Sequence, residues 1–371
     1  MNIPVYRLPY NEEDIKFVQT HIENILKTGY LTDGGEYVKR FEDAWKDIVK
    51  AKNSIAVSNC TTALELILRC IGVKNSSVIV PTYTFYATPL SVHNSGGRVL
   101  YADISKETLS LSLESIKKSI KWDTKAVIIV HVGGVISDEI EAIREYCDGR
   151  NIYLIEDAAC AHGASFNGKP VGSFGHATAY SFHHSKVLTS GEGGIVTTEN
   201  DEWANKIRRM RAIGLDRTIN NWEVFEIGNN YKIPETTAVM GLLHCNKAQD
   251  IFNERRKIAK FYDENLNFSG KIKKYNIPDN VVSGYYKYVV LTKHKQEIKD
   301  SLKERFNINL PPNIYDYLCH EQNINKEIRH LADSDFENAR YMMEHNLCLP
   351  MYIGLTDKEL QHIVDSINEV V

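Results

Sequence analysis

The sequence lacks the patterns that mark several common classes of protein. Its seven cysteines are scattered, and no two of them form a C-x-x-C pair. This spacing argues against a disulfide framework and against a structural zinc site, so we expect no metal centre. No apolar run approaches the ~20 residues that cross a bilayer, and the N-terminus shows no basic region followed by an apolar stretch. We therefore expect a cytoplasmic protein that does not use the membrane.

An excess of charge of either sign is also missing. The 371 residues carry a formal net charge of −4. A nucleic-acid partner is therefore not expected, because binding would require many lysines and arginines on one face. Internal repeats and low-complexity segments are absent as well. With 43% hydrophobic and 25% charged residues, the composition is that of a globular protein with a large core.

What the sequence does contain is a regular alternation of short apolar runs with helical patterns. One predicted helix spans residues 11–27, with Asn11 as its N-cap, and another spans residues 61–71. The predicted strands lie at 54–57, 78–80, 98–101, 126–131, 153–155, 177–182 and 195–198. Such alternation predicts an α/β fold with a mostly parallel sheet, in which ligands bind beyond the carboxyl ends of the strands.

The pattern changes after residue 241. One long charged helix is predicted from Leu242 to about Asn265, followed by strands at 285–291 and 308–311. We therefore divide the chain into a large α/β domain, residues 1–245, and a smaller C-terminal α+β domain, residues 246–371.

The most informative motif is SFHHSKVLTSGEGG, residues 181–194. It places Lys186 among apolar neighbours, five residues after Ser181 and just before a glycine-rich turn. Most lysines are simply solvated. A lysine held in an apolar cleft, however, has a lowered pKa and can attack a carbonyl. A pyridoxal phosphate enzyme needs such a lysine to hold its cofactor.

Two further segments fit such a cofactor. The turn SNCTTAL, residues 58–64, follows a strand and opens a helix, where backbone N–H groups bind phosphate. N-capping by Asn59 or Thr61 is the commoner explanation of such a turn. Asp157 ends a predicted strand, and a protonated pyridine nitrogen would supply the cation that its burial requires. An aspartate that caps a turn or pairs with an arginine would give the same pattern.

Together these segments resemble the DegT/DnrJ/EryC1/StrS family of sugar aminotransferases, which are fold-type I pyridoxal phosphate enzymes. The resemblance begins at Thr28 and closes at Tyr352, and it includes PTYTF, EDAA and GNNYK at residues 81–85, 156–159 and 228–232. Both the order and the spacing of these motifs follow the family.

The resemblance implies the roles of individual residues. Lys186 would hold the cofactor through a Schiff base and then move the proton, and Asp157 would bind the pyridine nitrogen. The other cofactor-binding residues that it implies are Cys60 and Thr61 through their backbone, Phe85 stacked on the ring, Cys160 beside the ring, Ser181 at the phosphate, and Asn230. Asn230 would reach the phosphate from a second subunit, so a homodimer would share its active sites.

Three positions depart from the family pattern. Cys60 stands where the family has glycine, and a backbone contact there requires a negative φ. Cys160 stands where glutamine or histidine is usual, and a thiol is a weaker hydrogen-bond donor than either. Lys232 replaces the usual arginine and loses its planar fork.

One branch of the family performs dehydration and has a histidine in place of the lysine. His184 lies close to that position. Lys186, however, is five residues from both Ser181 and Gly191, which is the family spacing of the lysine. The resemblance therefore favours a transaminase.

The expected reaction moves an amino group from an amino acid, glutamate in this family, to a keto group of a nucleotide-linked sugar, through a pyridoxamine phosphate intermediate. Two alternatives remain open: an acceptor that is a non-nucleotide keto sugar or sugar acid, and a non-catalytic regulator that binds pyridoxal phosphate. Tyr231, Tyr317 and His320 are candidates for contact with the sugar.

Overall fold

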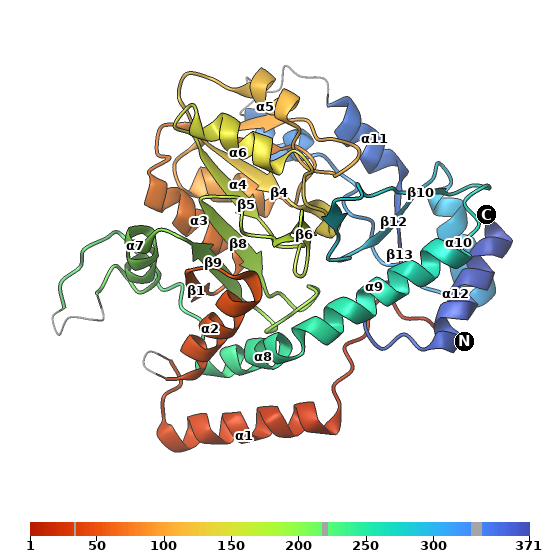
Figure 1. The fold of residues 1–371 in the computed structure, drawn as a ribbon, viewed down its shortest axis with the longest axis horizontal. Coiled ribbons are helices and arrows are strands. Elements are labelled where there is room, and N and C mark those ends of the chain that lie inside the picture. Colours follow the sequence, from red (N-terminus) through yellow and green to blue (C-terminus); the bar gives the residue numbers. More distant parts are fainter. Residues whose placement is uncertain (33–34, 217–221, 328–335) are drawn as a thin grey trace.

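The computed structural model describes residues 1–32, 35–216, 222–327 and 336–371 (Figure 1). A seven-stranded sheet, in the order β1-β9-β8-β5-β4-β2-β3, forms the centre of its larger part. The strands are β1 Asn53–Val57, β2 Ser77–Pro81, β3 Arg98–Ala102, β4 Thr124–Val130, β5 Tyr153–Asp157, β8 Ala177–Ser181 and β9 Gly194–Thr198. The pairs from β3 across to β8 are parallel, and β9 runs antiparallel to both of its neighbours. The predicted mostly parallel sheet is confirmed.

Helices cover this sheet and bury it. Those that alternate with its strands are α3 Cys60–Ile71, α4 Ala87–Asn94, α5 Leu113–Ser119, α6 Ile140–Asp148 and α7 Asp201–Arg211, with the 3-10 turn η1 Val132–Gly134 after β4. Every residue of β2, β8 and β9 is buried. Apolar strands of this kind follow from a sheet with helices on its faces, because neither face meets water.

Three more helices, α1 Glu12–Thr28, α2 Tyr37–Val49 and α8 Glu235–Asn246, lie on the side of β1. There α2 packs on β1, α8 packs on α2, and α1 packs on α8. Asn11 caps α1 as predicted: its side chain accepts the N–H of Asp14 at 2.9 Å, and Asp14 returns a bond to the N–H of Asn11.

The N-terminus of α2 is capped by a residue far away in the sequence. The local N-cap, Glu36, makes no capping bond. Instead the buried carboxylate of Glu235 accepts the N–H groups of Tyr37 at 2.6 Å and Val38 at 3.2 Å. A carboxylate at this end of a helix satisfies free N–H groups and suits the helix dipole.

We expect Glu235→Ala to lower the free energy of unfolding by about 1–3 kcal/mol, because it leaves two N–H groups at a buried helix end without an acceptor. The midpoint of urea unfolding measures this loss. Glu36→Ala is the control and should change stability by less than about 0.5 kcal/mol, since Glu36 is exposed. An equal loss in both variants would contradict the assigned cap.

The C-terminal part is built around a small antiparallel sheet. Its strands are β10 Lys273–Lys274, β12 Tyr288–Leu291 and β13 Asn346–Leu349, and its helices are α9 Ala248–Asn265, α10 Lys295–Phe306, α11 Glu337–His345 and α12 Asp357–Val370. Another small sheet joins β11 Val281–Val282 to β6 Ser165–Phe166 and β7 Lys169–Pro170. Two 3-10 turns, η2 Cys319–Glu321 and η3 Asn323–Glu327, lie between α10 and α11. None of the helices in the described ranges is long and apolar enough to cross a membrane.

Two predictions for this part are wrong. The long helix from 242 to 265 is two helices, α8 and α9, which meet at Lys247 (φ −102°, ψ 4°). The Lys247 ammonium binds Asp14 of α1 at 2.6 Å, a contact that no local pattern reveals. The strand predicted at 308–311 is only a bridge between Ile308 and Ile3, because the prolines at 311–312 lack the N–H donors that a ladder needs.

The division at residue 245 stays a prediction. A second apolar cluster contains most buried side chains from Ile258 onward, together with Ile3 at the other end of the chain. Cys319, Phe336 and Cys348 pack into the first cluster instead. Both termini accordingly lie on the same side of the molecule, next to α12 (Figure 1).

Candidate active site

A cavity of about 870 Å³ lies beyond the carboxyl ends of β4, β5 and β8. This is where an open α/β sheet binds its ligands. Of the eight cofactor-binding residues expected from the sequence, seven line the cavity: Cys60, Thr61, Phe85, Asp157, Cys160, Ser181 and Lys186. Segments that are distant in the sequence therefore meet in one place.

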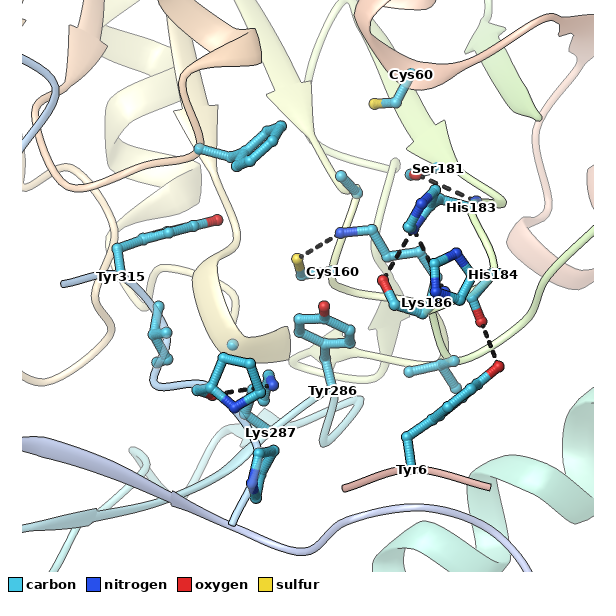
Figure 2. Close-up of a pocket in the computed structure, with 18 of the residues that line it drawn as sticks. Tyr6, Cys60, Cys160, Ser181, His183, His184, Lys186, Tyr286, Lys287 and Tyr315 are labelled. Atoms are coloured by element: carbon cyan, nitrogen blue, oxygen red, sulfur yellow. Dashed lines mark hydrogen bonds between the residues drawn. The ribbon is translucent and has the colours of Figure 1, made fainter. Parts of the chain in front are cut away.

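Lys186 points into the cavity (Figure 2). Its Nζ donates a hydrogen bond to the Sγ of Cys160 at 3.3 Å, and it lies 4.7 Å from the centre of the Tyr286 ring. Burial lowers the pKa of the Lys186 ammonium, but Cys160, Tyr286 and Cys60 raise it more when they ionise, and the net pKa is raised. The lowered pKa expected from the sequence is therefore wrong in direction, because the apolar neighbours in the sequence are not the nearest groups in space.

We expect Cys160→Ala to lower the pKa of Lys186 in the cofactor-free protein. Each unit of that fall raises the neutral fraction of the amine about tenfold, so added pyridoxal phosphate should attach faster wherever the Cys160 thiol of the wild type is ionised. The rate at which visible absorption develops, followed against pH, measures the change. Cys60→Ala is the matched control and should shift the profile less, since Cys60 is the weaker influence. Profiles that coincide in all three proteins would contradict this role of Cys160.

Asp157 ends β5 and is 5% exposed. Its carboxylate accepts the hydroxyl of Thr88 at 2.8 Å and the N–H of Ala159 at 3.1 Å. Burial raises the pKa of Asp157 in spite of these bonds and the charge of Lys186. No lysine, arginine or histidine in the described part of the chain forms an ion pair with it. A buried carboxylate of this kind fits a cationic ring nitrogen.

The start of α3 offers free backbone donors to the same cavity. Of the two N-cap candidates, Asn59 and Thr61, it is Asn59 that caps the helix, by accepting the N–H of Thr62 at 2.8 Å. The N–H groups of Cys60 and Thr61 have no acceptor among the described residues. Cys60 is not one of the residues with a positive φ. The side chain at this position therefore does not prevent a backbone contact. Such N–H groups at a helix N-terminus bind phosphate.

The glycine-rich turn allows β9 to pass beside these donors. A Cβ at Gly194 would lie 2.4 Å from the backbone of Asn59, so only glycine fits there. Ser181, at the end of β8, is buried and lines the cavity. Its hydroxyl accepts the N–H of His183 at 3.4 Å and keeps its own proton to donate. Together with α3, this arrangement fits a phosphate group.

Phe85 and Asn230 stand apart from these buried groups. The Phe85 ring lines the cavity and is 61% exposed, which leaves its face open to a ligand. Asn230 is exposed and does not line the cavity of its own chain.

Of the three candidates for sugar contact, only Tyr317 lines the cavity. His320 bonds to the hydroxyl of Thr82, and the Tyr231 hydroxyl donates to Glu65 at 3.0 Å. Both side chains are thus held elsewhere within this chain.

The sequence did not reveal several residues of the cavity wall. Figure 2 shows the Tyr286 ring beside Lys186, and Tyr315 on the other side of Cys160. Tyr6 lies near the N-terminus, and its hydroxyl donates to the carbonyl of His184 at 2.9 Å. None of these tyrosines belongs to a motif, so no local signal could have identified them.

The fold and the cavity define the class of protein. A large mostly parallel sheet with flanking helices, a smaller C-terminal part, and a lysine and a buried aspartate at the strand ends are features of fold-type I aminotransferases. The chain belongs to the DegT/DnrJ/EryC1/StrS aminotransferase family, whose profile matches residues 12–368. The resemblance in the sequence is confirmed, and the protein is a sugar aminotransferase of this family. Pyridoxal phosphate is the cofactor of the family.

Known proteins are similar to this chain in sequence or in fold. GDP-perosamine synthase of Caulobacter vibrioides is 29% identical over 379 residues, which cover 100% of this chain and 98% of that protein. Helicobacter pylori PseC, an aminotransferase involved in the biosynthesis of pseudoaminic acid, superposes with a TM-score of 0.90 at 24% identity, over 100% of this chain and 99% of that one. NtdA of Bacillus subtilis with bound cofactor PMP superposes with a TM-score of 0.87 at 24% identity, over 100% and 86%.

Proposed function

We propose that this chain transfers an amino group from L-glutamate to a keto group of a nucleotide-linked sugar, with pyridoxal phosphate as its cofactor. The observation that carries the proposal is the meeting of Lys186, Asp157 and the N-terminus of α3 in one cavity. The nucleotide-linked acceptor is supported by the relative named GDP-perosamine synthase. The amino donor rests on the family resemblance.

The residues present fit the cofactor group by group. Asp157 would hold the ring nitrogen, Phe85 would stack on the ring, and the N–H groups of Cys60 and Thr61 with the Ser181 hydroxyl would hold the phosphate. When bound, the cofactor supplies an aldehyde that takes up the amino group and a ring that withdraws electrons. Lys186 would first attach the cofactor and afterwards, as a free amine at its Nζ, move the proton of the donor.

We also propose that two copies of the chain share the cavity. Asn230 lies outside its own cavity, on a segment with several exposed apolar side chains: Trp222 at 85%, Val224 at 58%, Phe225 at 46% and Ile227 at 90%. A second copy that covers this segment would remove the apolar surface from water. It would also bring Asn230 toward the phosphate.

The first test is the visible spectrum of the purified protein. Pyridoxal phosphate joined to Lys186 should absorb in the visible region, and L-glutamate should bleach that band. Keto sugar nucleotides added next should restore it and yield an amino sugar. Bleaching with no product from any nucleotide-linked sugar would favour a non-nucleotide keto sugar or sugar acid, and a band that no amino acid bleaches would favour a non-catalytic role.

A further inference from the structure

The active-site cavity contains a buried arginine that the reaction described so far does not use. Arg255, in α9, lines the cavity and is 7% exposed. Its Nε donates to the carbonyl of Tyr285 at 3.0 Å, and its Nη2 donates to the carbonyls of Tyr286 at 3.2 Å and Met351 at 3.0 Å. Its Nη1 has no acceptor among the residues that the structure describes. One edge of the guanidinium is therefore held by the protein, and the other is left for a ligand.

The charge of Arg255 is also not paired with any carboxylate of the described ranges in direct contact, and Glu254, the preceding residue, acts on it only from beyond ion-pair distance. Burial lowers the pKa of Arg255 to about 10, and the side chain is still charged at neutral pH. Carbonyl groups solvate a cation without neutralising it, and a buried charge without an opposite charge is costly. An anion that enters the cavity would remove this cost.

The other cations of the cavity wall differ from Arg255. Arg7 forms an ion pair with Glu359 at 2.7 Å. Lys186 is assigned to the cofactor. Lys287 is only partly buried and donates to the carbonyl of Pro312 at 3.2 Å. Arg255 is thus the buried cation of the cavity that combines a fixed orientation with unused donors.

Arg255 and the reacting lysine line the same cavity and contact the same residue, Tyr286. Arg255 binds the backbone carbonyl of Tyr286, whose ring lies 4.7 Å from Lys186 Nζ. An amino acid that reacts at Lys186 carries a carboxylate a few bonds from its nitrogen. A guanidinium presents paired N–H groups that match a carboxylate. We infer that Arg255, through Nη1, binds a carboxylate group of the amino donor, an assignment that rests on the proposed function.

The next residue in the sequence provides a matched control. Arg256 is half-buried in the same helix, and it also donates to a backbone carbonyl, that of Gly163 at 2.7 Å. It lines a separate cavity of about 550 Å³ and not the active site. Substitution of Arg256 therefore measures how far the loss of an arginine–carbonyl contact in α9 changes ligand binding when no group of the active site is removed.

The test measures binding of glutarate, a dicarboxylate without an amino group, to the protein with its cofactor by calorimetry. Arg255→Met should weaken glutarate binding roughly tenfold to a hundredfold, since hydrogen bonds to charged groups are the stronger ones. Arg256→Met should leave it unchanged. In turnover, Arg255→Met should raise KM for L-glutamate by a similar factor and leave KM for the keto sugar unchanged.

Two further measurements keep the inference testable if Arg255→Met does not fold. Arg255→Lys keeps a charge but loses the fork, and it should also weaken glutarate binding. In the wild-type protein, glutarate should protect Arg255 from phenylglyoxal, as mapped by mass spectrometry. Equal glutarate affinity in all variants, no protection, or a matching loss of affinity for the keto sugar would overturn the inference. Glutarate binding without any bleaching by L-glutamate would instead count against the proposed donor alone.

Discussion

Lys186→Ala is expected to remove the visible absorption of the freshly purified protein and to lower the rate of amino transfer by at least about 10²–10⁴-fold. The physical reason is that one nitrogen has two tasks. Lys186 Nζ is the cavity amine that we expect to bond covalently to the aldehyde, and once free it is the base placed to move the donor proton. Absorption spectra and single-turnover rates with L-glutamate measure the two losses.

The cavity offers a matched control for this variant. Lys287 also lines the wall, and its Nζ donates to the carbonyl of Pro312. Lys287→Ala should keep the visible absorption, because Cys160 binds the Nζ of Lys186, whereas the Nζ of Lys287 binds the carbonyl of Pro312. An intact band in Lys186→Ala, or a lost band in Lys287→Ala, would refute the assignment of the lysine.

Asp157→Asn is expected to have opposite effects on activity and on the stability of the cofactor-free protein. The amide keeps the shape and can still bond to Thr88, but it cannot neutralise a protonated ring nitrogen. We expect a rate loss of about 10²–10³-fold, as for the removal of other preorganised electrostatic groups. Rapid-mixing measurements of the reaction with L-glutamate test this loss.

The effect on stability follows from the pKa of Asp157, which is raised in the folded chain. A carboxyl group with a raised pKa binds protons more tightly in the folded state than in the unfolded state. Stability of the cofactor-free protein therefore falls as pH rises from the unfolded value, about 3.9, to the folded value. Asp157→Asn removes this loss, so the cofactor-free variant should melt at a higher temperature than the wild type at neutral pH.

Thr88→Val is the control for Asp157→Asn. It removes one hydrogen bond to the carboxylate and keeps the charge. Its rate should fall less than that of Asp157→Asn, and its cofactor-free form should not be stabilised. If Asp157→Asn transfers amino groups within about tenfold of the wild-type rate, the carboxylate does not serve the cofactor in the manner proposed here.

The sequence by itself determined the elements whose signals are local. Alternating apolar runs located the seven strands of the large sheet, because buried parallel strands are continuous apolar segments. Asn11 identified one helix start, and Asn59 was one of two N-cap candidates for another, since an N-cap bonds within three residues. Asn59, Asp157 and Ser181 lie at or near the ends of predicted strands, which parallel strands bring to one edge, and Lys186 follows Ser181 by five residues.

Tertiary structure alone decided the features that depend on distant segments. The sequence could not show that Glu235 caps α2, that Lys247 separates α8 from α9, or that Cys160 contacts Lys186. The direction of the pKa of Lys186 depends on the balance between burial and groups far away in the chain. Arg255 has no recognisable motif, because its three carbonyl partners come from two other segments. Such contacts lack any periodicity, and only the folded chain brings their residues together.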